Sequence, residues 1–338
     1  MGFSIKRLDK YFRWVRNLSS SYNENLVIGK DYAKYCRMET VCSLIGDKTN
    51  ERKWAERKHL WISRYIRESI PETLKKYQGC TSPDNLFDPQ SEVKVWSMWW
   101  QGEENAGELF RMCIASARKH IPYPVVVLDK VNYAKYIDLP EYVIQKHNEG
   151  KVRIQHMCDL MFASILAQQG GFFTGATVYW TQDAEEDLLR APFFTPRAVD
   201  WDTTAVSKFR WTGYLMAGNK EFPLFQFARD ALLEYWKNRD AAVDYLLLDY
   251  IFDIAYSDIP CVKVLIDSLP EKNNMLRNEL IGHLSDPYDE ELFRRYTFGD
   301  TKFYKLSWKF GKKEKITETN QMTNYGHMLD ELGIQERR

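Results

Sequence analysis

The sequence predicts an α/β fold, in which a mixed, mainly parallel sheet is flanked by helices and preceded by a helical region. Three observations support this. From residue 93 onward, short runs of β-branched and aromatic residues alternate with segments of helical periodicity. Residues 1–88 are charged and helical in pattern. The chain has 338 residues, 44% hydrophobic and 28% charged, which suits one large globular core with appended helices.

The N-terminal segment mixes basic and apolar residues in the run IKRLDKYFRWVRNL. Such a segment suits peripheral contact with the inner face of a membrane. A helix that packs on a partner or on the core explains the same pattern and is favoured. No secretory signal and no run long enough to span a bilayer is evident, so we expect a cytoplasmic protein.

A second helical stretch is expected over residues 50–77, interrupted or ended at Pro71. Residues 80–90 contain two prolines and several turn formers, which predicts a linker into the main domain. We therefore divide the chain into a helical region (1–88), an α/β domain (90–265) and a C-terminal extension (266–338) that completes the site.

The elements of the α/β domain follow from residue type and spacing. VKVWSMWW and PVVVLD suit buried strands, and a Gly-Gly pair marks the end of the helix that precedes the next strand. The order strand, helix, strand, helix, strand predicts a mainly parallel sheet. The expected elements are strands over 93–100, 124–129 and 172–180, a strand or hairpin arm over 206–217, a strand-like stretch over 301–315, and helices over 106–120, 140–147, 155–169, 222–237 and 241–256.

Composition and missing motifs exclude several function classes. Lys plus Arg equals Asp plus Glu, at 47 each, so we expect no nucleic-acid partner. The six cysteines are scattered, without a CxxC pair or a zinc-like cluster, and indicate reduced thiols. GxGxxG, Walker, HExxH and GxSxG motifs are missing, which argues against dinucleotide enzymes, P-loop ATPases, zincins and α/β-hydrolases.

Open parallel sheets bind ligands at the carboxyl ends of their strands. Here those ends carry side chains suited to a nucleotide sugar, since tryptophan stacks on rings, Gln and Asp bond to base or ribose, and small residues let the backbone approach a phosphate. A strand-end Asp is nevertheless more often a turn or helix cap. The strand-end candidates are Trp99, Gln101, Asp129, Gly175, Ala176 and Thr177.

The run VWSMWWQGEENAGELFRMCIASARKH resembles the opening strand and helix of the capsular polysaccharide synthesis glycosyltransferases, relatives of DxD-containing mannosyltransferase-like enzymes. HMCDLMFASILAQQGGFFTGATVYWT is similar to that family's block H-x-S-D-x-x-R…GG-x-W-x-D-A-T. RWTGYLMAG, LLEYWK, DYLLLDYIFDIAY and KLSWK resemble later blocks, in the same order, over about residues 90–310.

The resemblance implies a GT-A-like, Rossmann-type domain. It also implies transfer of a sugar, of the hexosyltransferase type, from a nucleotide-diphosphate donor to a glycan or lipid-linked glycan acceptor. The predicted donor-binding residues are Trp99, Gln101, Asp129, Asp159, Gly171, Gly175, Ala176, Thr177 and Lys305.

The family is expected to hold Mn²⁺ or Mg²⁺ with an Asp at the third strand end, where the metal neutralises the leaving diphosphate. Here that position is Gly175, so no metal ligand is assigned and the metal itself is doubtful. The family's helix Arg falls at Phe162 and its Ser at Cys158, and only Asp159 of that set remains.

Three explanations of these departures stay open. The protein is an inactive relative that binds a partner or glycan, or other cations replace the metal, or a nearby acidic triplet supplies new ligands. The triplet is more simply a solvated helix start. The cations considered are Lys208, Arg210 and Lys305, and the triplet is Asp183, Glu185 and Glu186.

Asp244 and Asp249 are the predicted catalytic residues, because the DYLLLDY block of the family approaches the reacting sugar or the acceptor. We expect both on one helix, on neighbouring faces, with Asp249 toward the acceptor. An Asp in so apolar a segment is costly unless it is paired or functional. A helix cap for Asp244 and a buried structural hydrogen bond for Asp249 are the alternatives.

Overall fold

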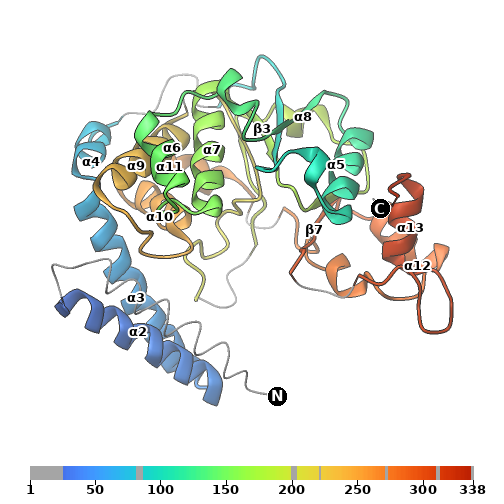
Figure 1. Ribbon diagram of the computed structural model, residues 1–338, viewed down its shortest axis with the longest axis horizontal. Helices are drawn as coiled ribbons and strands as arrows, with labels where there is room; N and C mark the ends of the chain where they lie inside the picture. The colour runs from blue at the N-terminus through green and yellow to red at the C-terminus, as the bar shows by residue number, and fades with distance from the viewer. Residues whose placement is uncertain are drawn as a thin grey trace.

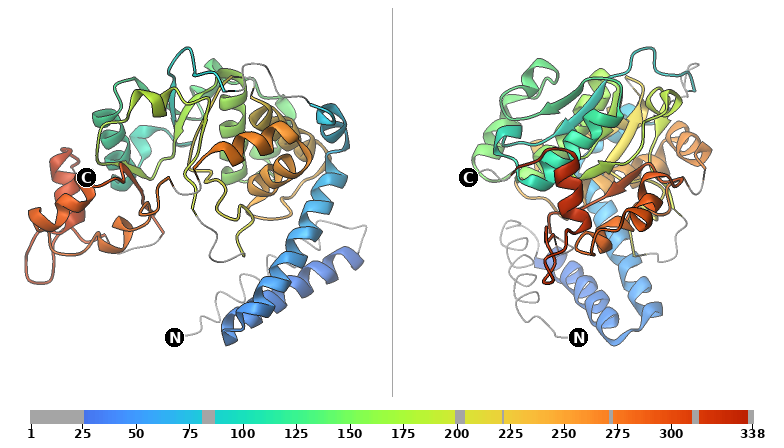
Figure 2. Two further views of the ribbon diagram at one scale, coloured as in Figure 1. Left: turned by 180° about the vertical axis from the view of Figure 1, so that it is seen from behind. Right: turned by 90° about the vertical axis from the view of Figure 1, so that its right-hand side faces the viewer.

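The computed structural model describes residues 26–80, 87–198, 204–220, 222–270, 273–309 and 313–335. An α/β body carries helices on both faces of its main sheet, and an N-terminal helical hairpin projects from it (Figures 1 and 2). The mixed α/β fold predicted from the sequence is confirmed. The basic segment at the N-terminus, with its predicted membrane contact, lies outside the described residues.

The main sheet has the strand order β2-β1-β3-β6-β5. Its strands β1 (Val95–Met98), β2 (Val125–Leu128) and β3 (Gly171–Thr174) are mutually parallel. β6 (Leu215–Gly218) runs antiparallel to β3, and β5 (Phe193–Phe194) runs antiparallel to β6. The chain therefore enters β6 at the same edge of the sheet at which the parallel strands end.

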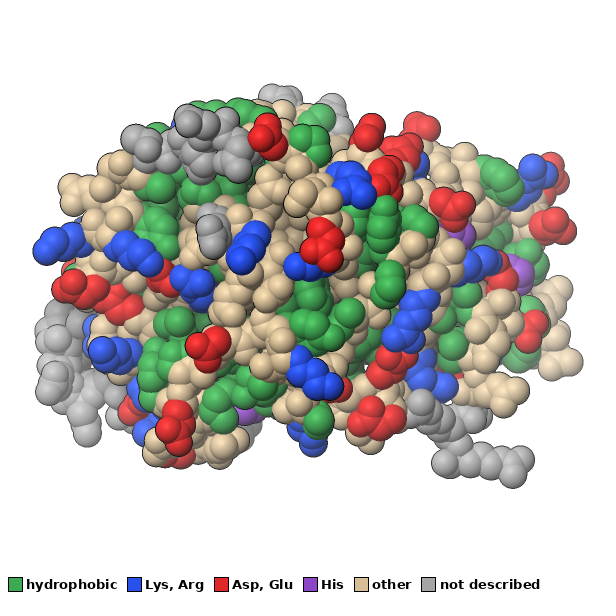
Figure 3. All heavy atoms as spheres, turned by 90° about the horizontal axis from the view of Figure 1, so that it is seen from above, with side chains coloured by type: hydrophobic (Ala, Val, Ile, Leu, Met, Phe, Trp, Pro, Cys, Tyr) green, Lys and Arg blue, Asp and Glu red, His purple; other side chains and the backbone are tan. Residues whose placement is uncertain are grey.

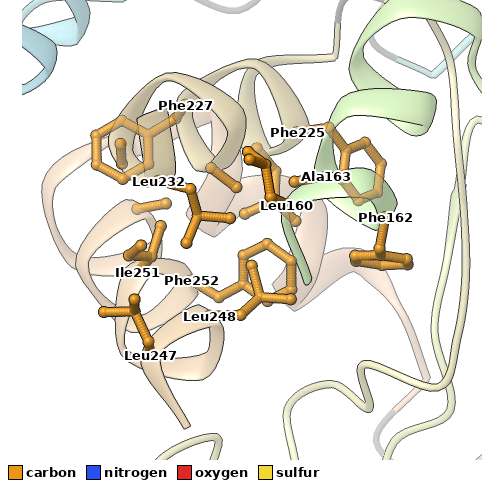
Figure 4. Close-up of a cluster of buried hydrophobic side chains, with 14 of the residues drawn as sticks. Leu160, Phe162, Ala163, Phe225, Phe227, Leu232, Leu247, Leu248, Ile251 and Phe252 are labelled. Carbon is orange, nitrogen blue, oxygen red and sulfur yellow. The ribbon is translucent and has the colours of Figure 1, made fainter. Parts of the chain in front are cut away.

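Alternate residues of each strand face two separate cores, as the two-residue period of a strand requires. Trp96, Phe173 and Met216 pack with the helices on one face, in the cluster that also contains Phe162 (Figure 4). Val95 and Phe172, the neighbours of the first two, pack on the other face with α5. Burial on both faces explains why the strands are continuously apolar in sequence.

Helices α2 (Leu26–Ile45) and α3 (Lys48–Ser69) form the projecting hairpin. The predicted interruption at Pro71 is confirmed, because α3 ends before it and α4 (Pro71–Tyr77) begins with it. Gly170 ends α7 with φ of 66°, a left-handed value that favours glycine. The helices of the body are α5 (Glu108–His120), α6 (Glu141–Asn148), α7 (Ile154–Gln169), α8 (Glu186–Leu189), α9 (Pro223–Asn238), α10 (Leu247–Asp258), α11 (Pro260–Ser268), α12 (Glu290–Thr297) and α13 (Asn324–Glu331).

Four predicted elements were wrong in extent; one is the strand-like stretch over 301–315, of which only Phe303–Lys305 is a strand among the described residues. The single strand expected over 172–180 is two strands, β3 and β4 (Val178–Trp180), separated by a turn. β4 leaves the main sheet and pairs antiparallel with β7 (Phe303–Lys305). The arm expected over 206–217 is regular only in β6, and the helix expected over 241–256 begins at Leu247.

The C-terminal extension joins the body through β7 and through a third core beneath α5, α12 and α13. Short 3-10 helices lie at Glu103–Asn105, Tyr133–Lys135 and Leu280–His283. On the face in Figure 3, acidic and basic side chains are interspersed, as the equal numbers of the two charges would lead one to expect. The domain boundaries at 88–90 and 265–266 stay predictions.

Candidate functional site

The carboxyl ends of the three parallel strands meet at one edge, and backbone pairing continues beyond them. Trp99 N donates to Leu128 O at 2.9 Å, and Lys130 N donates to Trp100 O at 3.1 Å. On the other side, Gly175 N donates to Tyr214 O at 2.7 Å. The segment that leads into β6 therefore lies beside the end of β3, and the strand-end candidates share this edge.

The strand-end residues after β1 and β2 have different surroundings. The Trp99 ring packs on Phe110, with ring centres 4.9 Å apart, and its buried indole N–H has no hydrogen-bond partner among the residues that the structure describes. Gln101 is exposed. The Asp129 carboxylate accepts from the backbone N–H groups of Val131 (2.7 Å) and Asn132 (2.8 Å), so it caps its own turn. Asp129 therefore has the turn-cap role. Nucleotide contact by Trp99, Gln101 and Asp129 stays a prediction.

The turn after β3 brings Thr177 to a lysine that is distant in sequence. Lys305 Nζ donates to Thr177 Oγ1 and to Leu306 O, both at 2.6 Å, and lies 5.5 Å from the centre of the Tyr214 ring. Burial lowers the Lys305 pKa, and among the described residues no carboxylate pairs with it. The structure thus unites two predicted donor residues with Gly175 and Ala176.

Gly175 is required by the close approach of β6 to β3. A Cβ atom at this position would lie 2.7 Å from Tyr214 O and 3.3 Å from Tyr214 Cβ, and the first contact is shorter than real Cβ atoms make. The hydrogen bond from Gly175 N to the same carbonyl holds the two segments together. An aspartate would need the backbone of β6 to move.

A carboxylate pair occupies the other end of the 211–214 segment. Asp249, in the first turn of α10, accepts from the buried Trp211 indole N–H at 2.9 Å. Burial, partly offset by this bond, and then the charges of Asp159 and Asp244 raise the Asp249 pKa to about 6. Burial also raises the pKa of Asp159. Neither Asp159 nor Asp249 forms an ion pair with a Lys or Arg in the described part of the chain.

His156 lies beside Asp159, one helical turn earlier on α7. Its Nδ1 is 3.5 Å from Asp159 Oδ2 but does not complete a hydrogen bond, and the side chain is buried. Carboxylates with raised pKa and few partners are typical of functional sites. The arrangement can accept hydrogen bonds from a sugar or take up a proton from a hydroxyl group.

Asp244 lies in the loop before α10, so the expectation that it shares a helix with Asp249 was wrong. Its Oδ1 accepts from Leu246 N at 2.9 Å, and its Oδ2 accepts from the Tyr32 hydroxyl of α2 at 3.2 Å. The N-terminal hairpin therefore contacts a predicted catalytic residue, a connection that sequence spacing does not reveal.

Phe162 stands where the family resemblance implies an arginine, and its side chain is part of the hydrophobic core. Phe162 is 3% exposed and packs edge-on against Phe173, Phe225 and Phe252 (Figure 4). Cys158, one turn earlier, is half-buried, and burial raises its pKa to about 12. Phe162 faces the core and is not a vacant arginine position.

Most of the alternative ligands proposed from the sequence already have partners. Arg210 donates to Asp253 at 2.6 Å, while Lys208 is exposed. Each member of the acidic triplet contacts a basic side chain at the surface, which favours the solvated helix start. The contacts are Asp183 with His120, Glu185 with Lys302, and Glu186 with Arg190.

Gly171 is not at this edge. It begins β3, so it lies at the opposite end of that strand from Gly175. Its φ is 110°, and a Cβ atom would lie 2.5 Å from Lys94 O. Packing against β1 requires this glycine, and its assignment to the donor site is corrected.

Three residues at this edge were missed by residue-level reasoning. Trp211 and Tyr214 belong to the RWTGYLMAG block. They lie at this edge because the block leads directly into β6, which pairs with β3. Arg277 had no signal in the sequence. It is 6% exposed, and its backbone oxygen accepts from Lys305 N at 2.6 Å.

The residues present do not fit a metal at the end of β3. Gly175 supplies no ligand, and the Lys305 ammonium contacts Thr177, two residues further along the chain. The described residues contain no group of three or more His, Cys, Asp or Glu side chains that could hold a metal ion. A site built on the pattern that the family resemblance implies is therefore missing its first ligand.

Comparisons with known proteins place this geometry in context. No curated protein matches the chain. The structure is similar to that of the PaToxG glycosyltransferase, with 12% identity and a TM-score of 0.39, over 62% of this chain and 83% of that chain. No helix among the described residues is both long and apolar enough to cross a bilayer. The family model of the capsular polysaccharide synthesis protein matches residues 43–327, and the chain belongs to that family.

Proposed function

We propose that the protein is a glycosyltransferase that transfers a sugar from a nucleotide-diphosphate donor to a glycan or lipid-linked glycan acceptor. Family membership supports a role in capsular or surface polysaccharide assembly. One observation carries the proposal at the level of the site. Within the described ranges, a lysine without a carboxylate partner and two carboxylates without a Lys or Arg partner lie at opposite ends of the 211–214 segment, on the ligand-binding edge of the sheet.

The roles follow from charge. Lys305 and the Thr177 turn face the leaving diphosphate, where a positive group stabilises the negative charge that develops as the glycosidic bond breaks. Trp99, Gln101 and Asp129 lie beside them, at positions suited to the nucleoside. Asp159 accepts hydrogen bonds from the transferred sugar.

Asp249 acts on the acceptor side in this proposal. With a pKa of about 6, it is mostly ionised at neutral pH yet still basic enough to draw a proton from an acceptor hydroxyl. The Trp211 indole fixes the carboxylate through its 2.9 Å hydrogen bond. Asp244, which lies in the loop before α10, is on the acceptor side as well.

The test is transfer and donor hydrolysis with a panel of UDP-, GDP- and CMP-sugars, with purified protein and mixed glycan acceptors. We expect turnover with one nucleotide class, and a loss of about 100-fold or more in kcat for Asp249→Asn. Asp253→Asn on the same helix is the matched control and retains turnover. Equal rates for wild type and Asp249→Asn would remove Asp249 from the chemistry.

A non-catalytic binding protein is the second candidate, favoured by Gly175 and Phe162 at positions where the family has charged residues. Calorimetry with UDP, GDP and CMP sugars separates the two. Donor binding without turnover for any acceptor supports the binding protein, and binding with turnover supports the enzyme. The cytoplasmic location and membrane contact stay predictions in either case.

A further inference from the structure

We infer that the tip of the helical hairpin, where α2 passes into α3, docks on an anionic lipid surface. The tip comprises the end of α2 and the turn that follows it, residues 41–48. The inference goes beyond the proposed function, because binding to lipid does not require sugar transfer. It concerns a segment other than the basic run at residues 5–18, for which the sequence suggested membrane contact.

The tip presents apolar side chains to solvent. Val41, Leu44 and Ile45 are 42%, 49% and 71% exposed, and they share one face of α2, because residues three and four apart are neighbours on a helix. The turn after them is closed by the backbone, since Asp47 N donates to Cys42 O at 2.9 Å. A fixed apolar group at the end of a helix suits insertion at the boundary between headgroups and acyl chains.

The hairpin also has an excess of positive charge. Residues 26–69 contain ten Lys or Arg and six Asp or Glu, whereas the whole chain is balanced at 47 each. Two acidic side chains close to the tip already have basic partners, because Glu51 pairs with Lys48 at 2.9 Å and Glu39 pairs with Lys58 at 2.6 Å. The positive excess favours an anionic lipid surface over a neutral one.

Basic side chains continue the apolar face along α2. Lys34 and Arg37 are exposed and precede Val41 at helical spacing. At 1.5 Å per residue, Arg37 lies about 6 Å and Lys34 about 10 Å behind Val41 along the helix axis, so both reach the headgroups when the tip is inserted. A second copy of the hairpin would bring the same positive charge against it, so lipid is the favoured occupant.

The hairpin connects this tip to the candidate site. The tip points away from the body (Figures 1 and 2), while His59 Nδ1 lies 2.7 Å from the Tyr250 hydroxyl of α10 and Tyr32 donates to Asp244 at 3.2 Å. Tyr32 and Ile45 are separated by about 20 Å along α2. Docking of the tip would therefore hold the acceptor side of the proposed site at a fixed height above the surface in which a lipid-linked acceptor lies.

The test is co-sedimentation of the full chain with vesicles of phosphatidylcholine, alone or mixed with phosphatidylglycerol. We expect wild type to bind the mixed vesicles at least about tenfold more tightly than the neutral ones, and high salt to weaken this binding. Serine in place of both Leu44 and Ile45 should weaken binding at least about tenfold, because the inserted apolar area is lost. Arg37→Gln should weaken it about fivefold.

Leu60→Ser and Arg64→Gln are the matched controls. Both side chains are exposed on α3 away from the tip, and Leu60 is 71% exposed, as Ile45 is. Both variants should bind as wild type does and, like the tip variants, should melt at the wild-type Tm. Equal losses in the controls, or undiminished binding by the tip variants, would overturn the inference.

Wild type alone also decides the matter. Equal binding to both kinds of vesicle, or binding to neither, would overturn the inference whatever the variants do. If wild type then forms a dimer in analytical ultracentrifugation that the Leu44 and Ile45 substitutions dissociate, the occupant of the tip is a second copy and not lipid. Vesicle binding without sugar transfer would count against the proposed function alone.

Discussion

Asparagine in place of Asp249 is expected to stabilise the folded protein at neutral pH while removing activity. The side chain lies in the first turn of α10, near Asp159 and Asp244, and the indole of Trp211 donates to it. Burial first, and then the two neighbouring carboxylates, raise its pKa to about 6. An amide keeps the oxygen that accepts from Trp211 and removes the charge.

The magnitude follows from linkage. An unfolded Asp titrates near 3.8, so the fold favours the protonated form; that stabilisation is complete below pH 3.8 and is lost as pH rises through about 6. At about 1.4 kcal/mol per pKa unit, the difference amounts to about 3 kcal/mol for a fully buried group. Partial exposure of Asp249 reduces this to about 1–2 kcal/mol. For a chain of 338 residues, that raises Tm by roughly 1–3 °C.

Thermal melts of wild type and Asp249→Asn, followed by circular dichroism from pH 4 to pH 8, measure the effect. The Tm difference should be present above pH 6 and vanish near pH 4. Asp253→Asn is the control of opposite sign, because it breaks the 2.6 Å ion pair with Arg210 and should lower Tm at pH 8. An Asp249→Asn protein that melts below wild type at pH 8 would show that the carboxylate is stabilised by its surroundings and would refute the reasoning.

Three further outcomes are expected. Gly175→Ala forces a Cβ atom against Tyr214 O and should cost about 1–3 kcal/mol in urea unfolding; an unchanged midpoint would contradict the close approach. Phe162→Arg puts an unpaired charge into an aromatic core and should cost about 3–5 kcal/mol or more, measured as lost soluble yield and Tm, so restoring the family's arginine will not restore activity. Burial lowers the pKa of His59, which bonds to Tyr250, to about 4, so its stabilising effect is complete above pH 6.5 and is lost as pH falls toward 4. His59→Gln should therefore lower Tm at pH 7.5 and have a smaller effect at pH 4.5, and a constant difference would contradict this.

The sequence predicted those elements that local residue types decide. The β-branched runs gave β1 and β2, the glycine pair gave the end of α7, and Pro71 gave the break between α3 and α4. The division of residues 172–180 into two strands was not predicted, although Gly175, Ala176 and Thr177 were placed at a strand end, because the division depends on two distant partners. The hydrogen bond from Gly175 N to Tyr214 O, directly before β6, and the pairing of β4 with β7 decide it.

The same limit applies to the candidate site. Lys305 was placed near Thr177 only through the family resemblance, since 128 residues separate them. Arg277 and Tyr32 carry no local pattern that distinguishes them from other buried or helical residues. Their positions follow from tertiary packing, which no spacing rule describes.

The hydrogen bond between Tyr32 and Asp244 joins a residue outside the region shared with the family to one inside it. The matched region starts at residue 43, so Tyr32 and most of α2 fall outside it. The loop that carries Asp244 is thus braced by a part of the chain that the shared family pattern does not include. Any preference for one acceptor that this loop confers belongs to this protein and to relatives with an equivalent contact. A chimera that carries only the matched region would lack Tyr32 and would lose that preference.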